Sequence, residues 1–405
     1  MLSLHTSPLE QPGSGDAGGM NVYVRSAALE LARSGIDVDI YTRASSPSQP
    51  DTVRLGPGVV VRHVVAGPLR RVAKEDLPRL SGELAHGVCE AGAGQAYDLL
   101  HSHYWISGIA GLDVARAWGL PLVHTMHTMA QVKNQRLQPG EHPEPPVRIH
   151  GEQQVVDGAA RLIANTATEA AELRDLYGAD PRLVDVVAPG VDLRLFHPHG
   201  RATSRAALRM PPETFHVVFA GRIQRLKGPH VLLHAAADLV RRRPDIPLAI
   251  SVIGAGSGAQ LLDLKPMVSA LGLERRVTLH EPVQAAALAG WFRSADVVAV
   301  PSFSESFGLV ALEAQACGTP VAAANVGGLP EALGNGRSGV LVDGHAPEAW
   351  SRALERLHDD PAGRTALGAA AAARAQNFGW QHTAALTGRS YEAAVAQHHA
   401  FSLPH

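Results

Sequence analysis

The chain of 405 residues has few cysteines and no long apolar run, and each shortage excludes a class of protein. The two cysteines, Cys89 and Cys317, lie far apart, so the sequence holds neither a disulfide framework nor a CxxC metal or redox motif. No stretch approaches the roughly 18–20 apolar residues of a membrane span. The opening segment also lacks the apolar core of a secretion signal. We therefore expect a cytoplasmic protein in a reducing compartment.

Charge is also scarce. Charged residues make up 18% of the chain and hydrophobic residues 45%, which excludes a disordered protein and supplies enough apolar material for real cores. The formal net charge of -2 gives no basic field, so we expect neither nucleic acid nor a membrane as a partner. Lysine is rare beside arginine, and the lysines are Lys74, Lys133, Lys227 and Lys265.

Short β-rich runs alternate with Ala- and Leu-rich helical stretches along the chain. This alternation predicts parallel sheets that are covered by helices on both faces. The first series opens with a strand at 2–6 and ends with one at 183–190. After a Pro-, Gly- and His-rich stretch, a second series extends from 215 to 343. A length of 405 residues likewise suits two domains.

The predicted fold is therefore an α/β protein of two Rossmann-like, doubly wound lobes that face a central cleft. We place the N-terminal lobe at 1–195 and the C-terminal lobe at 196–377, and we expect a C-terminal helix at 378–405 to return to the first lobe. In open sheets of this kind, ligands bind outside the carboxyl ends of the strands. Residues that directly follow a predicted strand are thus the candidates for a site.

Glycine-rich turns follow a predicted strand in each lobe, with GSGDAGG at 13–19 and VIGAGSG at 252–258. Glycine allows the backbone to approach a ligand, and the free N–H groups of a helix start favour an anion. The first pattern is neither a GxGxxG fingerprint nor a Walker A loop, so a phosphate cradle and a structural turn both stay open. Histidines gather at strand ends of the first lobe, but their spacing offers no third ligand, so we predict no zinc site.

Two cations follow the first strand of the second lobe. Arg222 and Lys227 stand in GRIQRLKG, directly before the next helix. Arginine offers a planar fork and lysine a point charge, and together these groups suit a diphosphate. The alternative is a salt-bridged turn.

Two carboxylates give the most specific signal. Glu305 precedes a predicted helix and Glu313 lies inside it, separated by seven nearly uncharged residues in PSFSESFGLVALEAQ. A carboxylate in a cleft can accept two hydrogen bonds from sugar hydroxyls. Stabilisation by the helix dipole would explain acids in the first turn, but Glu313 lies too deep in the helix for that. A further turn, Val326-Gly327-Gly328, lets the backbone approach the same region.

The E-x7-E segment, with GRx4KG upstream and GTPV downstream, resembles the retaining nucleotide-sugar glycosyltransferases of family 4, which have the GT-B fold. The resemblance covers essentially the whole chain. The segments HTSPLEQPGSGDAGGMNVYV, HSHYWISG and HTMHTMAQVKN, with EPPVRIHGE, are similar to one branch of that family. This branch transfers N-acetylglucosamine from UDP-GlcNAc to 1D-myo-inositol 3-phosphate in the first step of mycothiol biosynthesis.

The resemblance implies roles for individual residues. Arg222 and Lys227 would stabilise the departing diphosphate. Glu313 would hold the ribose, Glu305 the GlcNAc hydroxyls and the backbone of Val283 the uracil. From the first lobe, the donor site would be completed by Gln11, Pro12 and Gly19. The acceptor would be bound on the first lobe by His5, Asp16, Ala17, Gly18, Gly19, Met20, Asn21, Lys74, Tyr104, Thr128 and Arg148.

The resemblance also implies the mechanism and the partners. Cleavage of a sugar–phosphate bond builds negative charge on UDP, which Arg222 and Lys227 would stabilise in place of a divalent ion. Retention would follow from front-face attack, with His127 supporting the developing positive charge or binding the sugar. No cofactor would be required for the chemistry. A bound Mg²⁺ is implied near Phe292, Arg293, Ala295 and Thr319, and a homodimer is the usual state.

Other functions remain open at this point. A family 4 enzyme with another acceptor, such as a sucrose-phosphate synthase-like or mannosyl transferase, would share the donor motifs. A UDP-GlcNAc 2-epimerase has the same two-lobed architecture and would need no acceptor. A bilobed solute-binding protein is disfavoured because we identify no export signal.

Overall fold

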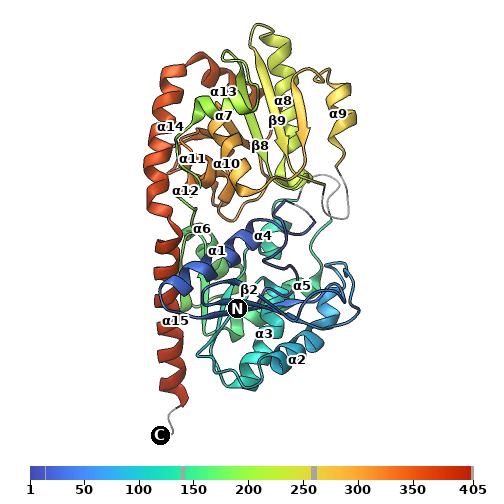
Figure 1. Cartoon of the computed structure of the whole chain (residues 1–405), viewed down its shortest axis with the longest axis vertical. Helices are drawn as coiled ribbons and strands as arrows, with labels where there is room; N and C mark the ends of the chain where they lie inside the picture. Colours follow the sequence, from blue (N-terminus) through green and yellow to red (C-terminus); the bar gives the residue numbers. More distant parts are fainter. Residues whose placement is uncertain (14, 138–141, 257–261, 403–405) are drawn as a thin grey trace. The chain divides into compact units, whose positions relative to one another are not determined.

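The structure, a computed structural model, describes residues 1–13, 15–137, 142–256 and 262–402. Parts of the predicted stretches 13–19, 252–258 and 378–405 therefore lie outside the described residues. The chain forms two compact units (Figure 1). Unit 1 comprises Met1–Glu10, Gly19–Ala188 and the chain from Trp380 on, whereas unit 2 comprises Gln11–Gly18 and Pro189–Gly379. We placed the boundary near 195, and the division lies between Ala188 and Pro189.

The sheet of unit 1 is parallel except at one edge. Its strands are β1 (Val38–Arg43), β2 (Thr52–Gly56), β3 (Val59–Val64), β4 (Leu100–His103), β5 (Leu122–Thr125), β6 (Arg161–Ala164) and β7 (Val184–Val186). They lie in the orders β1-β3-β2 and β4-β5-β6-β7. The edge strand β2 pairs antiparallel with β3, in contrast to the wholly parallel sheet that the sequence predicts.

The strand predicted at 2–6 is wrong in extent. Leu2 forms single parallel bridges to Tyr41 of β1 and Ser102 of β4, and so connects the two groups of strands. The chain then turns, because the hydroxyl of Ser3 donates to the carbonyl of Thr6 at 2.8 Å. The turn directs the next residues to the carboxyl ends of the strands, since Leu2 lies parallel to its neighbours.

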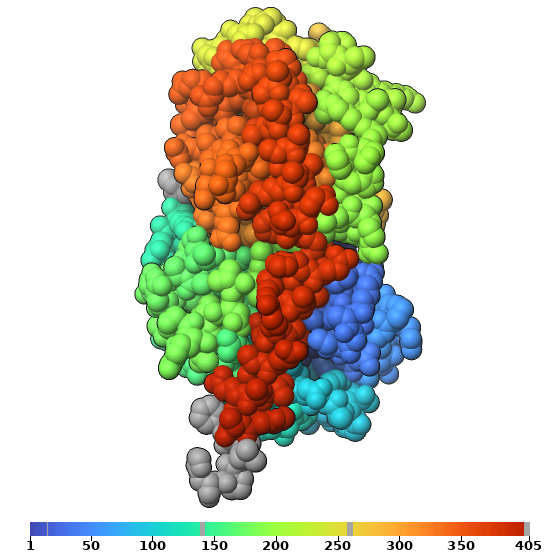
Figure 2. Space-filling model, turned by 90° about the vertical axis from the view of Figure 1, so that its left-hand side faces the viewer, coloured from blue at the N-terminus to red at the C-terminus, as the bar shows by residue number. Residues whose placement is uncertain are grey.

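Helices cover both faces of this sheet. They are α1 (Gly19–Arg33), η1 (Leu77–Leu80), α2 (Ser81–Ala91), α3 (Trp105–Trp118), α4 (Ala130–Asn134), α5 (Pro146–Gly158), α6 (Ala167–Tyr177), η2 (Pro181–Leu183) and α15 (Trp380–Ser402). The long α15 lies beside α1 (red and blue in Figure 2), where its Tyr391 and Ala394 join the core with Val24 and Leu31. The predicted return of the C-terminal helix thus completes unit 1.

Unit 2 has one parallel sheet, in the order β10-β9-β8-β11-β12-β13. The strands are β8 (Phe215–Ala220), β9 (Leu248–Ile253), β10 (Val277–His280), β11 (Val297–Val300), β12 (Val321–Ala324) and β13 (Val340–Val342). The helices are α7 (Arg201–Ala207), η3 (Arg225–Lys227), α8 (Pro229–Arg242), α9 (Leu264–Ala270), α10 (Ala285–Ser294), α11 (Leu309–Ala316), α12 (Leu329–Ala332), α13 (Pro347–Asp359), α14 (Pro361–Ala375) and η4 (Gln376–Phe378). This strand order is that of a dinucleotide-binding Rossmann sheet. The predicted fold of two doubly wound α/β units is confirmed.

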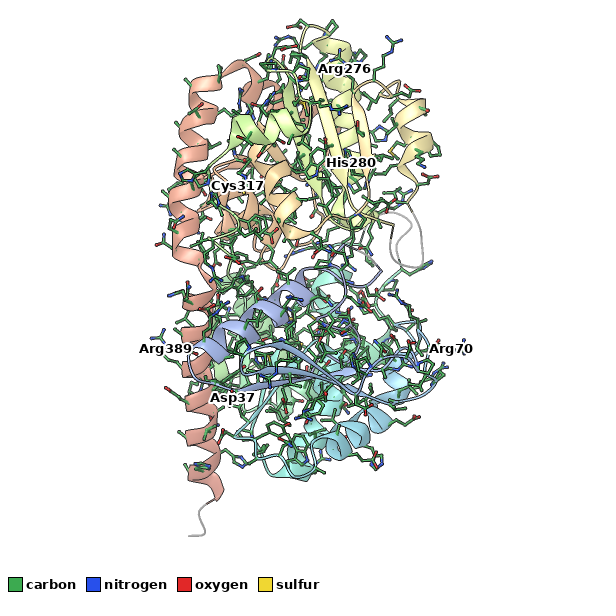
Figure 3. The ribbon with its side chains drawn as sticks, viewed as in Figure 1. Asp37, Arg70, Arg276, His280, Cys317 and Arg389 are labelled. Carbon is green, nitrogen blue, oxygen red and sulfur yellow. The ribbon has the colours of Figure 1, made fainter. Side chains whose placement is uncertain are left out.

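The two cysteines take no part in a disulfide. Cys317 follows α11 (Figure 3), and burial raises the pKa of its thiol to about 12, so the thiol stays protonated. Among the described residues, no helix has both the length and the apolar character that crossing a bilayer requires.

Candidate functional site

The strand order of unit 2 reverses between β8 and β11, which are neighbours in the sheet. At such a point the loops after the two strands leave the same edge in opposite directions and open a crevice between them. Arg222 and Lys227 follow β8, and Glu305 follows β11. The topology therefore gathers three of the predicted donor residues at the switch point of one sheet.

Lys227 and Glu305 form a direct ion pair. The Nζ of Lys227 lies 2.6 Å from Oε1 of Glu305, which also accepts a hydrogen bond of 2.9 Å from the hydroxyl of Ser302. The side chains of Lys227 and Glu305 are 22% and 16% exposed, so solvent reaches the pair and it does not lie in the core. Residues 78 positions apart thus form one charged group that can contact a ligand.

The glycine turn at Gly327-Gly328 holds the loop of Glu305 in place. The amide of Gly328 donates to the carbonyl of Glu305 at 2.9 Å. A Cβ at Gly327 would lie 2.0 Å from that same carbonyl oxygen, and Gly327 has a φ of +53°. Glycine is therefore required here by both the close approach and the left-handed conformation.

Glu313 lies in α11, where it keeps a small exposed surface. The surrounding protein is nevertheless dense enough that burial raises the pKa of its carboxyl to about 8. A protonated carboxyl has both a donor and an acceptor to offer to a diol. Unlike Glu305, this group has no ion-pair partner among the described residues.

The loop at 11–18 groups with unit 2, although its place in the sequence suggests the first lobe. Nε2 of Gln11 donates to the carbonyl of Val283 at 3.0 Å, and the amide of Ala255 donates to the carbonyl of Gly13 at 3.3 Å. A Cβ built on Gly18 would lie 3.6 Å from Nε of Arg222. Of the predicted donor residues, Gln11 and Pro12 therefore belong to unit 2, whereas Gly19 belongs to unit 1.

Tyr104 is the centre of a second cluster, in unit 1. The Nζ of Lys74 lies 4.3 Å from the centroid of its ring, and the guanidinium carbon of Arg148 lies 5.2 Å from it. The ring of His5 packs on it with centroids 4.4 Å apart. Tyr104 itself has a φ of +70°, an uncommon conformation for a residue other than glycine. Four predicted acceptor residues thus lie together.

Arg148 is hydrogen-bonded to Thr128, a fifth predicted acceptor residue. Its Nη2 donates to the carbonyl and the hydroxyl of Thr128, at 3.1 and 3.0 Å. Its Nε lies 2.8 Å from Glu152 and its Nη1 lies 2.9 Å from Glu144. The guanidinium is only 3% exposed, and carboxylates together with Tyr104 keep its pKa above the ordinary value against the effect of burial.

The predicted acceptor loop at 16–21 is divided between the units. Its members Asp16, Ala17 and Gly18 group with unit 2, and Gly19, Met20 and Asn21 with unit 1. The side-chain nitrogen Nδ2 of Asn21 donates to the hydroxyl of Thr6 at 2.9 Å and to the carbonyl of Ser7 at 2.7 Å. Asn21 thus fixes the turn that follows His5.

The ring of His127 packs against the buried rings of His103 and Tyr23. Its Nε2 is 3.0 Å from Nδ1 of His103, and the edge of Tyr23 packs against it with centroids 5.1 Å apart. Burial lowers the pKa of His127 to about 3, so the imidazole is neutral near pH 7. Its φ of +61° is uncommon for a residue other than glycine. A neutral imidazole can exchange hydrogen bonds but carries no charge.

The residues implied for Mg²⁺ do not fit a cation site in this structure. The carbonyl of Phe292 accepts from the hydroxyl of Thr319, and the carbonyls of Arg293 and Ala295 accept from the guanidinium of Arg201. An arginine therefore already donates to two of the carbonyls that a divalent ion would need. The described part of the chain also has no group of three or more His, Cys, Asp or Glu side chains that could hold a metal.

Sequence reasoning missed the acids around Arg148. Glu144 and Glu152 lie four residues before and after it. For Glu152, which lies with Arg148 in α5, this spacing places both side chains on one face of the helix and was a usable signal, whereas Glu144 precedes α5. Lys133, which is one of the rare lysines, also belongs to the cluster, because its Nζ lies 2.5 Å from Glu144.

Comparisons with known proteins agree over the whole chain. A family model described as Glycosyl transferase 4-like domain matches residues 18–190, and one described as Glycosyl transferases group 1 matches 200–374. A protein of Arthrobacter sp. (strain FB24) named D-inositol 3-phosphate glycosyltransferase is 59% identical over 98% of this chain and 95% of its own. A protein of the same name from Streptomyces griseus is 51% identical over 98% and 89%.

Solved structures give the same fold. Sucrose-phosphate synthase from Thermosynechococcus elongatus superposes with a TM-score of 0.90 at 32% identity, over 98% of both chains. Anabaena HepE in complex with UDP and glucose superposes with a TM-score of 0.75 at 20% identity, over 95% of this chain and 98% of its own. The second likeness concerns the fold alone.

Proposed function

We propose, from the premise that the chain belongs to the D-inositol 3-phosphate glycosyltransferase family, that it transfers N-acetylglucosamine from UDP-GlcNAc to 1D-myo-inositol 3-phosphate. The products are GlcNAc-inositol phosphate and UDP, and the anomeric configuration is retained. The observation that carries the proposal is the cation cluster of unit 1. Lys74 and Arg148 share the Tyr104 ring there, far from the nucleotide motifs in the sequence. An acceptor phosphate requires such a group.

The donor half of the reaction belongs to unit 2. Arg222 and Lys227 receive the diphosphate at the switch point, where they stabilise the charge that develops on the leaving group. Glu305 holds the ammonium of Lys227 in place and offers its remaining oxygen to the sugar hydroxyls. Glu313 holds the ribose with a carboxyl that burial keeps protonated near pH 7. Gln11 fixes the carbonyl of Val283, which contacts the uracil.

The acceptor half belongs to unit 1. Lys74, Arg148 and the hydroxyl of Thr128 bind the phosphate, and His5 orients the inositol ring from the turn that Asn21 fixes. The attacking hydroxyl approaches the anomeric carbon from the side of the leaving phosphate, which takes its proton. Because His127 is neutral, it contributes a hydrogen bond to the sugar rather than a charge. No step requires a metal, since the two cations of unit 2 take that role.

One experiment separates the candidate acceptors. The protein is incubated with UDP-GlcNAc and, in turn, inositol 3-phosphate, myo-inositol and fructose 6-phosphate, while release of UDP is measured. We expect turnover with inositol 3-phosphate, and proton NMR of the product should show the donor's anomeric configuration. Turnover with fructose 6-phosphate alone would instead favour a sucrose-phosphate synthase-like enzyme, a candidate that the 32% identical structure supports. Conversion of UDP-GlcNAc without any acceptor would favour an epimerase.

A further inference from the structure

The carboxylate of Glu144 lies where two cations converge. A single oxygen, Oε1, is 2.5 Å from Nζ of Lys133 and 2.9 Å from Nη1 of Arg148. The amide of Glu144 also donates to Oδ1 of Asn134 at 2.7 Å, which fixes the backbone at this point. An oxygen bound by an ammonium and a guanidinium has the surroundings of a phosphate oxygen in a binding site.

The second acid beside Arg148 is attached differently. Glu152 is fully buried in α5, and it accepts hydrogen bonds from the amide of Ala130 and the hydroxyl of Tyr177 as well as from Nε of Arg148. By contrast, Glu144 lies in a segment whose neighbouring residues are exposed, and its own side chain is 24% exposed. Glu152 is therefore a fixed support, whereas Glu144 can leave Arg148 without unfolding the helix.

The net charge of the cluster favours replacement of one carboxylate by a more highly charged anion. Burial lowers the pKa of Lys133, and the charges of Arg148 and, to a smaller extent, Lys74 lower it further, so these three cations act on one another. The two carboxylates leave this set of cations with an excess of positive charge. Against the effect of burial, Arg148 and Lys133 lower the pKa of Glu144 to about 2, so its carboxylate is ionised near pH 7. A phosphate dianion would neutralise the cluster more completely than one carboxylate does.

We propose that Glu144 is an internal substitute for the acceptor phosphate, which occupies Nη1 of Arg148 and Lys133 until a phosphorylated acceptor displaces it. The inference rests on the proposed function, because it assumes that the acceptor phosphate binds at Lys74 and Arg148. The displacement makes the site selective. A neutral polyol cannot replace the lost ion pairs, whereas a phosphate restores them.

The variant Glu144→Gln removes the competing charge and keeps the shape of the side chain. We expect it to bind inorganic phosphate at least about fivefold more tightly than the unmodified chain, and to lower the KM for inositol 3-phosphate in proportion, because competition for the site is a coupling free energy. Binding of inorganic phosphate to the full chain is measured by titration calorimetry. Glu172→Gln is the matched control, since Glu172 is a similarly exposed acid of unit 1 that pairs with Arg136. It should bind phosphate as the unmodified chain does.

Unchanged or weaker binding of inorganic phosphate by Glu144→Gln would overturn the proposal and make Glu144 a mere support of Arg148. Weaker binding of inositol 3-phosphate with unchanged binding of inorganic phosphate would also overturn it, because Glu144 would then contact the inositol ring. If the unmodified chain binds neither inorganic phosphate nor inositol 3-phosphate, the proposed acceptor site itself is wrong. That result differs from the two outcomes above, which concern Glu144 alone. If circular dichroism shows that Glu144→Gln does not fold, Glu144→Ala is tested instead, since it also removes the competing carboxylate. It too should tighten phosphate binding, and no gain would refute the proposal.

Discussion

The Nζ of Lys227 and the Oε1 of Glu305 lie 2.6 Å apart at the point where the sheet of unit 2 reverses its strand order. The cation follows β8 and the acid follows β11, so the two residues follow neighbouring strands of the same sheet. In the proposed function this pair joins the two roles that a donor site needs, which are charge stabilisation at the diphosphate and recognition of the sugar. It is therefore the first target for substitution.

Removal of either member should reduce turnover strongly while folding is preserved. Lys227→Met removes a cation aimed at the leaving group, and a loss of about 10²–10³ in kcat is the usual effect for one such group. Glu305→Gln should also lower kcat, and the double variant should lose less than the product of the two single losses, because the residues act as one group. UDP release under saturating substrates measures this. A near-normal kcat in Glu305→Gln would refute its role at the sugar.

Lys74→Ala should raise the KM for the acceptor far more than the KM for the donor. The ammonium lies over the ring of Tyr104 in unit 1 and belongs to the cluster assigned to the acceptor phosphate. Steady-state kinetics with each substrate varied in turn separates the two constants. Lys265→Ala is the control, because Lys265 is an exposed lysine of unit 2, and it should alter neither KM. Equal rises in both constants would remove Lys74 from the acceptor site.

Glu313→Gln should become more stable relative to the unmodified chain as the pH rises from about 4.5 to 8. Burial raises the pKa of Glu313 to about 8, so between these values the folded chain keeps a proton that the unfolded chain loses. The folded state then loses roughly 1.4 kcal/mol of stability per pH unit, which the glutamine variant avoids. Urea unfolding at pH 5 and pH 8 measures the difference.

The buried histidines should lower the stability of the folded chain as the pH falls, whereas Glu313 lowers it as the pH rises. Burial lowers the pKa values of His124 and His127 to about 3, and those of His101 and His103 also fall well below the ordinary value. Below about pH 6.5 these histidines bind protons in the unfolded chain but stay neutral in the folded chain. Each histidine therefore lowers the stability by roughly 1.4 kcal/mol for each pH unit of acidification. Urea unfolding at pH 7 and pH 5.5 tests this. His124→Asn should flatten the slope, whereas the exposed His382→Gln should leave it unchanged.

Much of the fold follows from the sequence because burial has a local period. The apolar runs at Val38–Arg43 and Phe215–Ala220 are buried strands, and alternation with helices implies parallel sheets. The strand Thr52–Gly56 escaped notice because it is exposed or half-buried along its length and therefore has no apolar run to mark it. The segment at 2–6 has such a run, yet it contributes only the two bridges of Leu2, since the turn after Ser3 ends the pairing.

The chemistry of the candidate site was also visible in the sequence, since the spacing of Glu305 and Glu313 and the rarity of lysine are properties of the chain alone. Only the tertiary structure decided which residues meet. In the folded chain Lys227 pairs with Glu305, which lies 78 positions further along the sequence. The side chain of Gln11 donates to the carbonyl of Val283 in unit 2, and Nη1 of Arg148 pairs with Glu144. The physical reason is that side-chain type and helical or strand period are local, whereas the neighbours of a strand end depend on strand order. Strand order is fixed only when the whole core packs.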